Sequence, residues 1–303
     1  MTEFLQQLIN GLALGAIYAL IALGYTMVYG VLRFINFAHG DVFMLGAFAG
    51  YFLSPLVNKF LPAQSYIGGA LVLVLAMAMC ALLGIVIEFL AYRPLRSRPK
   101  LTVLITAIGV SLFIEYTCQN SHVFGAAPHK FPDLIPATTF NFSGLVIGVN
   151  QIIVLVTTVL LLVALRFIVQ KTRMGTAMRA VSFNEPAAAL MGVNINSVIS
   201  FTFGLGSALA GAGGILFAMN YASIDPLMGV QTGLKAFVAA VLGGIGNLPG
   251  AALGGLILGL LETFAGGIPG VSNYRDGIAF AILILILLFK PAGLLGKSTV
   301  EKV

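Results

Sequence analysis

Four carboxylates interrupt otherwise apolar stretches of this sequence and are the first candidates for chemistry: Asp41, Glu88, Glu115 and Glu262. A carboxylate can transfer a proton, bind a metal ion or pair with a cation, and in apolar surroundings it needs such a partner. These four do not form a recognisable acid/base pair. The histidines are equally scattered, at His39, His122 and His129, and the motifs HExxH, Cys-x-x-Cys and Gly-x-Ser-x-Gly are absent. The sequence therefore favours neither an enzyme active site nor a bound metal.

The composition predicts an integral membrane protein. Hydrophobic residues make up 59% of the chain, charged residues only 9%, and the mean hydropathy is +1.03, whereas soluble domains carry about 25% charged residues. The net charge of +6 comes from basic residues in short loops between apolar runs. This distribution is typical of membrane topology and not of a nucleic-acid-binding face. We therefore expect membrane lipid, and no nucleic acid, around the protein.

The apolar runs predict a single all-α membrane domain over residues 1–303, with about eight or nine transmembrane helices. A helix needs roughly 20 apolar residues to cross a bilayer and satisfies its own backbone hydrogen bonds there. The two shortest runs flank the sequence GGIGNLPG and are candidates for a broken or re-entrant pair. The runs are 8–32, 41–58, 66–91, 101–118, 145–168, 197–220, 230–245, 250–266 and 274–290.

The basic residues predict the orientation of the chain. Short cytoplasmic loops are enriched in Lys and Arg. When successive loops are placed in turn on the two sides of the membrane, twelve basic residues fall on one side and four on the other. This asymmetry predicts an external N-terminus and a cytoplasmic C-terminus. The twelve are Arg33, Arg93, Arg96, Arg98, Lys100, Arg166, Lys171, Arg173, Arg179, Lys290, Lys297 and Lys302, and the four are Lys59, Lys130, Lys235 and Arg275. The longest external loop, about 119–144, contains three prolines and is predicted to be irregular.

Two polar interruptions are candidates for the wall of a path through the membrane. Residues 33–41 (RFINFAHGD) separate the first two runs and are rich in hydrogen-bonding groups. Irregular backbone at membrane depth must be buried in protein or face water; the alternative is an ordinary cytoplasmic turn. The candidate path residues are Asn36, Phe37, His39 and Asp41 here, Gly243, Gly244 and Asn247 at GGIGNLPG, and Glu262. Glu88 lies five residues before Arg93 and is expected to sit near a basic loop.

A polar segment, about 169–196, lies between two apolar runs on the predicted cytoplasmic side. Within it, Asn184 can cap a short helix, Pro186 fits the first turn, and Gly192 can end it. A short capped helix outside the bilayer predicts a docking element for another protein. Arg173 and Arg179 precede this helix. Positive-inside topology explains both, and the alternative is that they pair with acidic groups on a docked partner.

Small residues at four-residue spacing predict close helix contacts. Such contacts either pack this chain internally or join it to a second membrane subunit, and the two readings are compatible. The faces are Gly11, Gly15 and Ala19; Gly206, Ala210, Gly214 and Ala218; and Ala251, Gly255 and Gly259.

Three segments together resemble the LivH-type permeases, the membrane subunits of branched-chain amino-acid ABC importers. They are INGLALGAIYALIALGYTMVYGVLRFINFAHGD, NEPAAALMGVNINSVISFTFGLGSALAGAGG and VLGGIGNLPGAALGGLILGLLE. The resemblance runs from about residue 8 to 295. It implies a type II-like importer permease in the bacterial inner membrane, working by alternating access.

The resemblance also implies partners and a coupling helix. A Glu-Ala-Ala…Gly element docks on the ATPase in such permeases, and this chain matches it at Glu185, Ala187, Ala188 and Gly192, while Pro186 departs from it. The implied partners are two ATP-binding subunits that hold ATP-Mg, a paralogous second permease and a periplasmic substrate-binding protein, with no cofactor on this chain. Two alternatives remain open: urea or a short amide as substrate, and a stand-alone channel or facilitator for a small neutral solute.

Overall fold

The computed structural model describes residues 2–96 and 98–296. Within them the chain is helical apart from short strands. The helices are α1 (Thr2–Leu32), α2 (His39–Val57), α3 (Tyr66–Ile87), α4 (Lys100–Gln119), α5 (Val149–Lys171), α6 (Arg173–Phe183), α7 (Glu185–Leu190), α8 (Ile195–Tyr221), α9 (Met228–Gly243), α10 (Leu248–Gly266) and α11 (Arg275–Phe289). A π-helical turn (Glu88–Tyr92) and a 3-10 turn (Arg93–Leu95) extend α3, and a further 3-10 turn (Ser272–Tyr274) precedes α11. Lys297 and Lys302, counted above among the basic residues, lie outside the described residues.

Eight of the described helices are long and apolar enough to cross a membrane, and α9 is a shorter apolar helix. The expected eight or nine spans are therefore confirmed. α9 ends at Gly243, and Gly244 and Gly246 take positive φ angles of 106° and 90° before α10 begins. The break predicted at GGIGNLPG is thus present, and glycine permits it because these backbone angles are strained for other residues.

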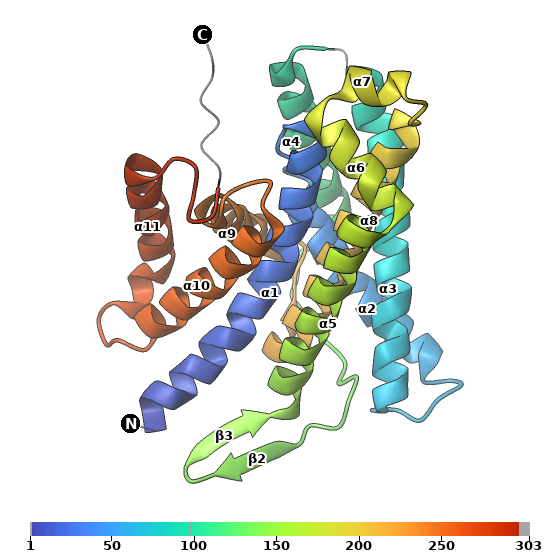
Figure 1. Ribbon diagram of the computed structural model, residues 1–303. Helices are drawn as coiled ribbons and strands as arrows, with labels where there is room; N and C mark the ends of the chain where they lie inside the picture. The colour runs from blue at the N-terminus through green and yellow to red at the C-terminus, as the bar shows by residue number, and fades with distance from the viewer. Residues whose placement is uncertain (1, 97, 297–303) are drawn as a thin grey trace.

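The predicted external loop is more ordered than its sequence indicated. β2 (Thr139–Phe142) pairs antiparallel with β3 (Leu145–Gly148), and β1 (His129–Lys130) pairs with β4 (Ser223–Ile224). The helix expected over 145–168 consequently begins only at Val149, because its first four residues complete the β2–β3 hairpin. Figure 1 shows this hairpin at the end of the molecule opposite α7.

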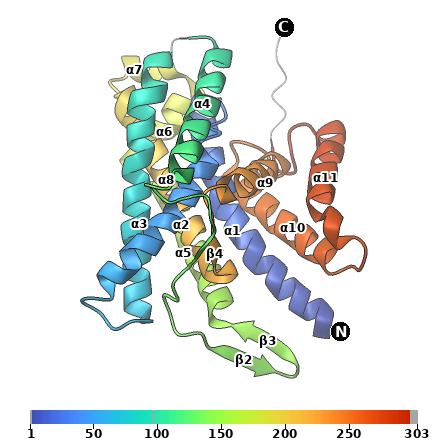
Figure 2. The ribbon, with the colours of Figure 1, turned by 180° about the vertical axis from the view of Figure 1, so that it is seen from behind.

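Helix α1 forms the axis of the fold. It runs from the hairpin end to the α7 end (Figure 1), is buried from Gly11 to Val28 almost without interruption, and packs on α8, α9 and α10. α8 is the second buried helix. α3, α4 and α5 instead turn many apolar side chains outward, as helices in contact with lipid do. Figure 1 and Figure 2 both show α3 at the edge of the molecule away from α10 and α11.

The predicted small-residue faces pack this chain internally. A Cβ added at Gly255 or Gly259 of α10 would meet the backbone of α1 at Ala19 or Gly15. On α8, a Cβ at Gly214 would meet the backbone of α2 at Phe43. In lipid, burying apolar side chains does not favour helix association, so close van der Waals packing of this kind stabilises the helix pairs instead. The internal-packing reading is therefore confirmed for these faces.

We expect Gly259→Val to destabilise the protein, because the added side chain forces α10 away from α1. Overpacking of this kind costs about 1–3 kcal/mol. Gly109→Val is the matched control, since Gly109 is also helical but a Cβ there meets nothing within 4 Å. Thermal unfolding of both variants in detergent measures the difference, and equal Tm values would contradict the packing described here.

Candidate functional site

Helices α6 and α7 form a compact unit outside the candidate spans. Thr172 caps α6 by accepting a hydrogen bond from the Gly175 amide at 3.1 Å. The Asn184 side chain caps α7 by accepting from the Ala187 amide at 3.0 Å, and Gly192 takes a φ of +82° just after the helix. The predicted short helix, with its cap, its first-turn proline and its glycine end, is confirmed.

This unit is tied firmly to two membrane helices. On the α5 side, the Arg179 guanidinium donates to the Val169 carbonyl, and Gly175 lies against the backbone at Ile168 and Val169. On the α8 side, the Val193 amide donates to the Ala188 carbonyl at 3.1 Å, and Asn194 caps α8. Arg179, a candidate above for pairing with a partner, also ties α6 to the end of α5 within this chain. A force on α7 would reach both α5 and α8.

Large apolar side chains are exposed at α7 and directly beside it, although α7 lies outside the candidate spans. Phe183, Leu190 and Met191 are 88%, 89% and 84% exposed. Ala188 faces inward, whereas Glu185, Pro186 and Ala187 are exposed. Large apolar side chains gathered at such a place mark an interaction surface. We call Phe183, Glu185, Pro186, Leu190 and Met191 the α7 face.

Sequence reasoning missed the three apolar residues of the α7 face. The sequence did hold a sign of them, because they lie in or next to the short helix of the polar segment. That segment was predicted to lie outside the bilayer, where large apolar side chains are unusual. In a chain as apolar as this one, however, single Phe, Leu and Met residues do not stand out. The folded arrangement shows that all three side chains are almost fully exposed.

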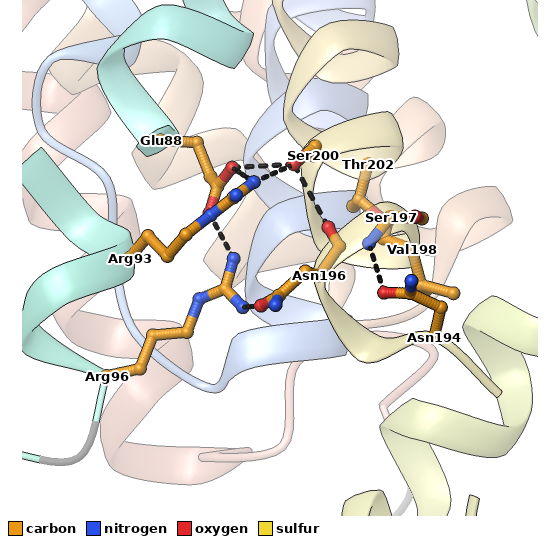
Figure 3. Close-up of polar contacts among 9 residues, drawn as sticks. All are labelled: Glu88, Arg93, Arg96, Asn194, Asn196, Ser197, Val198, Ser200 and Thr202. Atoms are coloured by element: carbon orange, nitrogen blue, oxygen red, sulfur yellow. Dashed lines mark hydrogen bonds and ion pairs between the residues drawn. The ribbon is translucent and has the colours of Figure 1, made fainter. Parts of the chain in front are cut away.

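A buried carboxylate joins α3 to α8 at the same end of the molecule (Figure 3). Glu88 pairs with Arg93 at 2.9 Å and with Arg96, and accepts a hydrogen bond from the Ser200 hydroxyl at 2.7 Å. Arg96 also donates to the Asn196 side chain at 2.8 Å. The expectation that Glu88 lies beside a basic loop is confirmed, and its partners offset the cost of burying its charge.

The interruption at 33–41 contains a true helix break, residues 33–38, and the chain from Asn36 onward is mostly buried in protein. The Asn36 side chain accepts from the Tyr92 hydroxyl at 2.6 Å, and Asp41 accepts from the Ser111 hydroxyl at 2.5 Å. His39 stacks edge-on against Tyr25 with ring centroids 4.6 Å apart. Asn36, His39 and Asp41 are buried and Phe37 is half-buried. The structure therefore brings these candidate path residues together around the start of α2, enclosed by their own chain.

The candidate path residues at GGIGNLPG have structural partners at the opposite side of α1. The Asn247 side chain accepts from the Gly250 amide at 3.1 Å, which caps α10, and donates to the Leu295 carbonyl at 2.7 Å. The Leu295 amide in turn donates to the Gly243 carbonyl at 3.0 Å. The chain after α11 therefore packs against the break between α9 and α10, where it contacts Gly243, Gly244 and Asn247.

Glu262 belongs to a charge cluster between α1, α9, α10 and α11. Its carboxylate accepts from the Tyr18 hydroxyl and from the Lys235 ammonium, both at 2.7 Å. Lys235 also pairs with Asp276 at 2.8 Å. Lys235 and Glu262 are buried. Counting Lys235 as an external loop residue was therefore wrong, because it lies inside α9. An ionisable residue within an apolar run is expected to have a buried partner, and this pattern was visible in the sequence.

In the part of the chain that the structure describes, no three His, Cys, Asp or Glu side chains come together as a possible metal site. The chemistry that the site offers is thus of two kinds. One is an exposed docking element at α7, and the other is a set of hydrogen-bonded polar groups buried among the membrane helices.

Comparison with known proteins identifies the family. Residues 7–287 match the family described as "Branched-chain amino acid transport system / permease component". The chain belongs to this family. It is a multi-pass membrane permease and not an enzyme, and as one component of a transport system it acts together with others. No solved structure matches it.

Individual relatives are similar over nearly their full length. The permease protein BraD of a high-affinity branched-chain amino acid transport system of Pseudomonas aeruginosa is 41% identical over 309 residues, covering 99% of this chain and 98% of that protein. LivH of Escherichia coli K12, named likewise, is 40% identical over 305 residues, with the same coverage. A probable LivH of Methanocaldococcus jannaschii is 30% identical over 293 residues, covering 91% of this chain and 88% of that protein.

We expect Lys235→Met to destabilise the permease, because Glu262 then stays buried without its cation. Breaking a buried ion pair from one side costs about 3–5 kcal/mol, whereas removing both charges costs less. The double variant Lys235→Met/Glu262→Gln should therefore recover part of the loss. Lys59→Met, at an exposed position after α2, serves as the control. Unfolding in detergent measures all three, and a double variant no more stable than Lys235→Met would contradict the pairing.

Proposed function

We propose that this permease is the transmembrane subunit of an ATP-driven ABC importer for branched-chain amino acids. The observation that carries the ATP-driven part is the α7 face, a capped helix with exposed apolar side chains outside the membrane. A channel that works alone has no need of such an element. The substrate class is supported by relatives that are named for branched-chain amino acid transport along their full length.

The proposed mechanism is alternating access driven through α7. ATP-Mg binds and is hydrolysed on two partner subunits, and their closure pushes on the α7 face. Because Arg179 ties α6 to the end of α5, and Val193 and Asn194 join α7 to α8, the push moves two membrane helices together. The importer then reorients between its two sides by shifting packed helices.

The remaining partners and the orientation belong to the same proposal. A periplasmic substrate-binding protein delivers the amino acid, and a second, paralogous permease completes the path, in the bacterial inner membrane. The N-terminus is external and the C-terminus cytoplasmic. This orientation is supported by Arg33, Arg96, Arg98 and Lys100, which surround one cavity beside α7, since basic residues favour the cytoplasmic side.

The proposed path uses the polar groups buried around the start of α2 and the charge cluster at Glu262. Asn36, His39 and Asp41 are placed next to a helix break, where helices can shift without breaking regular hydrogen bonds. Glu262 links α1, α9 and α10 through Tyr18 and Lys235. In the proposed cycle these contacts loosen and re-form as the helices move.

Substitution of Leu190 and Met191 together by serine should release the ATP-binding subunits. Both side chains are almost fully exposed, so the double variant folds normally but loses the apolar contacts expected at the centre of the interface. The apparent Kd for the ATP-binding subunit should rise at least about tenfold. Phe142→Ser is the matched control, because Phe142 is 74% exposed at the opposite end of the molecule. Unchanged binding by the double variant would remove α7 from the proposed interface.

Reconstitution in proteoliposomes tests the function as a whole. With the cognate ATP-binding subunits, second permease and binding protein, we expect ATP-dependent uptake of radiolabelled leucine, isoleucine or valine, and no uptake without ATP. Uptake of urea or acetamide in place of these amino acids would replace the proposed substrate class. Solute flux through this permease alone, without partners or ATP, would favour the channel.

A further inference from the structure

A cavity of about 410 Å³ lies beside the α7 face. Three parts of the chain line it: the end of α1, the segment that leads into α4, and the turn between α6 and α7. Its apolar lining includes Val31, Phe34 and Val103, and residues 183–186 line it on the α7 side. The cavity therefore joins the exposed α7 face to the end of α1, to the start of the helix break and to α4.

The walls of this cavity are strongly basic. The lining includes four cations, Arg33, Arg96, Arg98 and Lys100, and one carboxylate, Glu185. Arg96 is paired with Glu88. Among the described residues, no carboxylate lies within ion-pair distance of Arg33, Arg98 or Lys100, and Arg33 has only a 3.3 Å hydrogen bond to the Ser182 carbonyl. Uncompensated like charges around a hollow concentrate a positive potential within it and attract an anion.

The position of the cavity indicates which anion it meets. Asn184, Glu185 and Pro186 form both the first turn of α7 and one wall of the cavity. A protein docked on the α7 face therefore also covers the cavity, and Arg98 and Lys100, which line the cavity with α7, are exposed. A carboxylate on the docked protein complements these charges, since it can accept a bidentate pair from Arg98 while the Lys100 ammonium approaches the same oxygens.

We propose that this basic cavity receives an acidic side chain, or a short acidic segment, of the ATP-binding subunit docked on the α7 face. The inference rests on the proposed function and extends it. The α7 face supplies an apolar contact, and the cavity supplies a second, electrostatic one on α1 and α4. Movement of the ATP-binding subunit then acts directly on the end of α1, next to the helix break that precedes α2.

Carbodiimide cross-linking of the assembled complex tests this contact. The reagent condenses a carboxylate with a nearby lysine amine into an amide, so we expect a cross-link between Lys100 and an acidic peptide of the ATP-binding subunit, located by mass spectrometry. Lys100→Arg is the matched variant: it keeps the charge and the binding but removes the amine, and the cross-link should disappear. A complex that is fully bound yet gives no cross-link at Lys100 would overturn the proposal.

Binding at graded salt gives an independent readout. Arg98→Gln/Lys100→Gln should raise the Kd for the ATP-binding subunit roughly tenfold at low salt and flatten its dependence on salt. The control Arg166→Gln/Lys290→Gln removes the same charge from two exposed positions outside the cavity and should leave both unchanged. Equal effects of the two variants would overturn the proposal.

Native mass spectrometry separates the main competing occupant. If the wild-type permease retains an anionic phospholipid that Arg98→Gln/Lys100→Gln loses, while the ATP-binding subunit binds both equally, the cavity is a lipid site and the proposal is wrong. The outcome is distinct from failure of the proposed function, because in that case the ATP-binding subunit would not bind the wild-type permease at all.

Discussion

Close backbone contact between α1 and its neighbours is the constraint on which the rest of this structure depends. In lipid, apolar side chains gain nothing by leaving one apolar environment for another, so helices associate through tight packing and internal polar contacts. Gly15 and Ala19 of α1 meet Gly255 and Gly259 of α10 at distances that exclude a larger residue. α1 can then serve as an axis for helices on both sides, while α3, α4 and α5 remain at the lipid surface.

The same close packing makes the buried polar groups tolerable. Glu262 reaches Lys235 and Tyr18 only because α9, α10 and α1 approach one another, and Glu88 reaches Ser200 only because α3 lies against α8. Each charge pair is thus a tie between helices as well as a satisfied group. The irregular chain at 33–38 is stable for a related reason: Asn36 is buried, and Tyr92 supplies a hydrogen bond to it from a neighbouring helix.

In the proposed importer, these contacts between helices determine where the force from the ATP-binding subunits is applied and which membrane helices it moves. The α7 face is small, but α7 is capped at its start, packs on α6 and α8, and is held to α5 through α6, so it does not move on its own. The basic cavity adds a second point of action at the end of α1. Helices that are packed this tightly move as bodies and do not bend locally, so displacement at one face is carried into the core.

The sequence by itself determined the fold class, the approximate number of spans, the small capped helix and the small-residue faces. These features depend on local or periodic patterns. The length of an apolar run determines whether a helix can cross the membrane, and Asn184, Pro186 and Gly192 determine where a short helix starts and ends. Small residues at four-residue spacing define one face of a helix. It also identified Glu88 and Glu262 as groups that needed partners. Only the tertiary structure decided which partners they have, that Lys235 lies within the bundle, and that the loop before α5 contains a hairpin. It also decided that Phe183, Leu190 and Met191 are exposed around α7, next to a basic cavity. These features depend on contacts between residues far apart in the chain, and in a sequence this uniformly apolar no local pattern specifies which helix lies next to which.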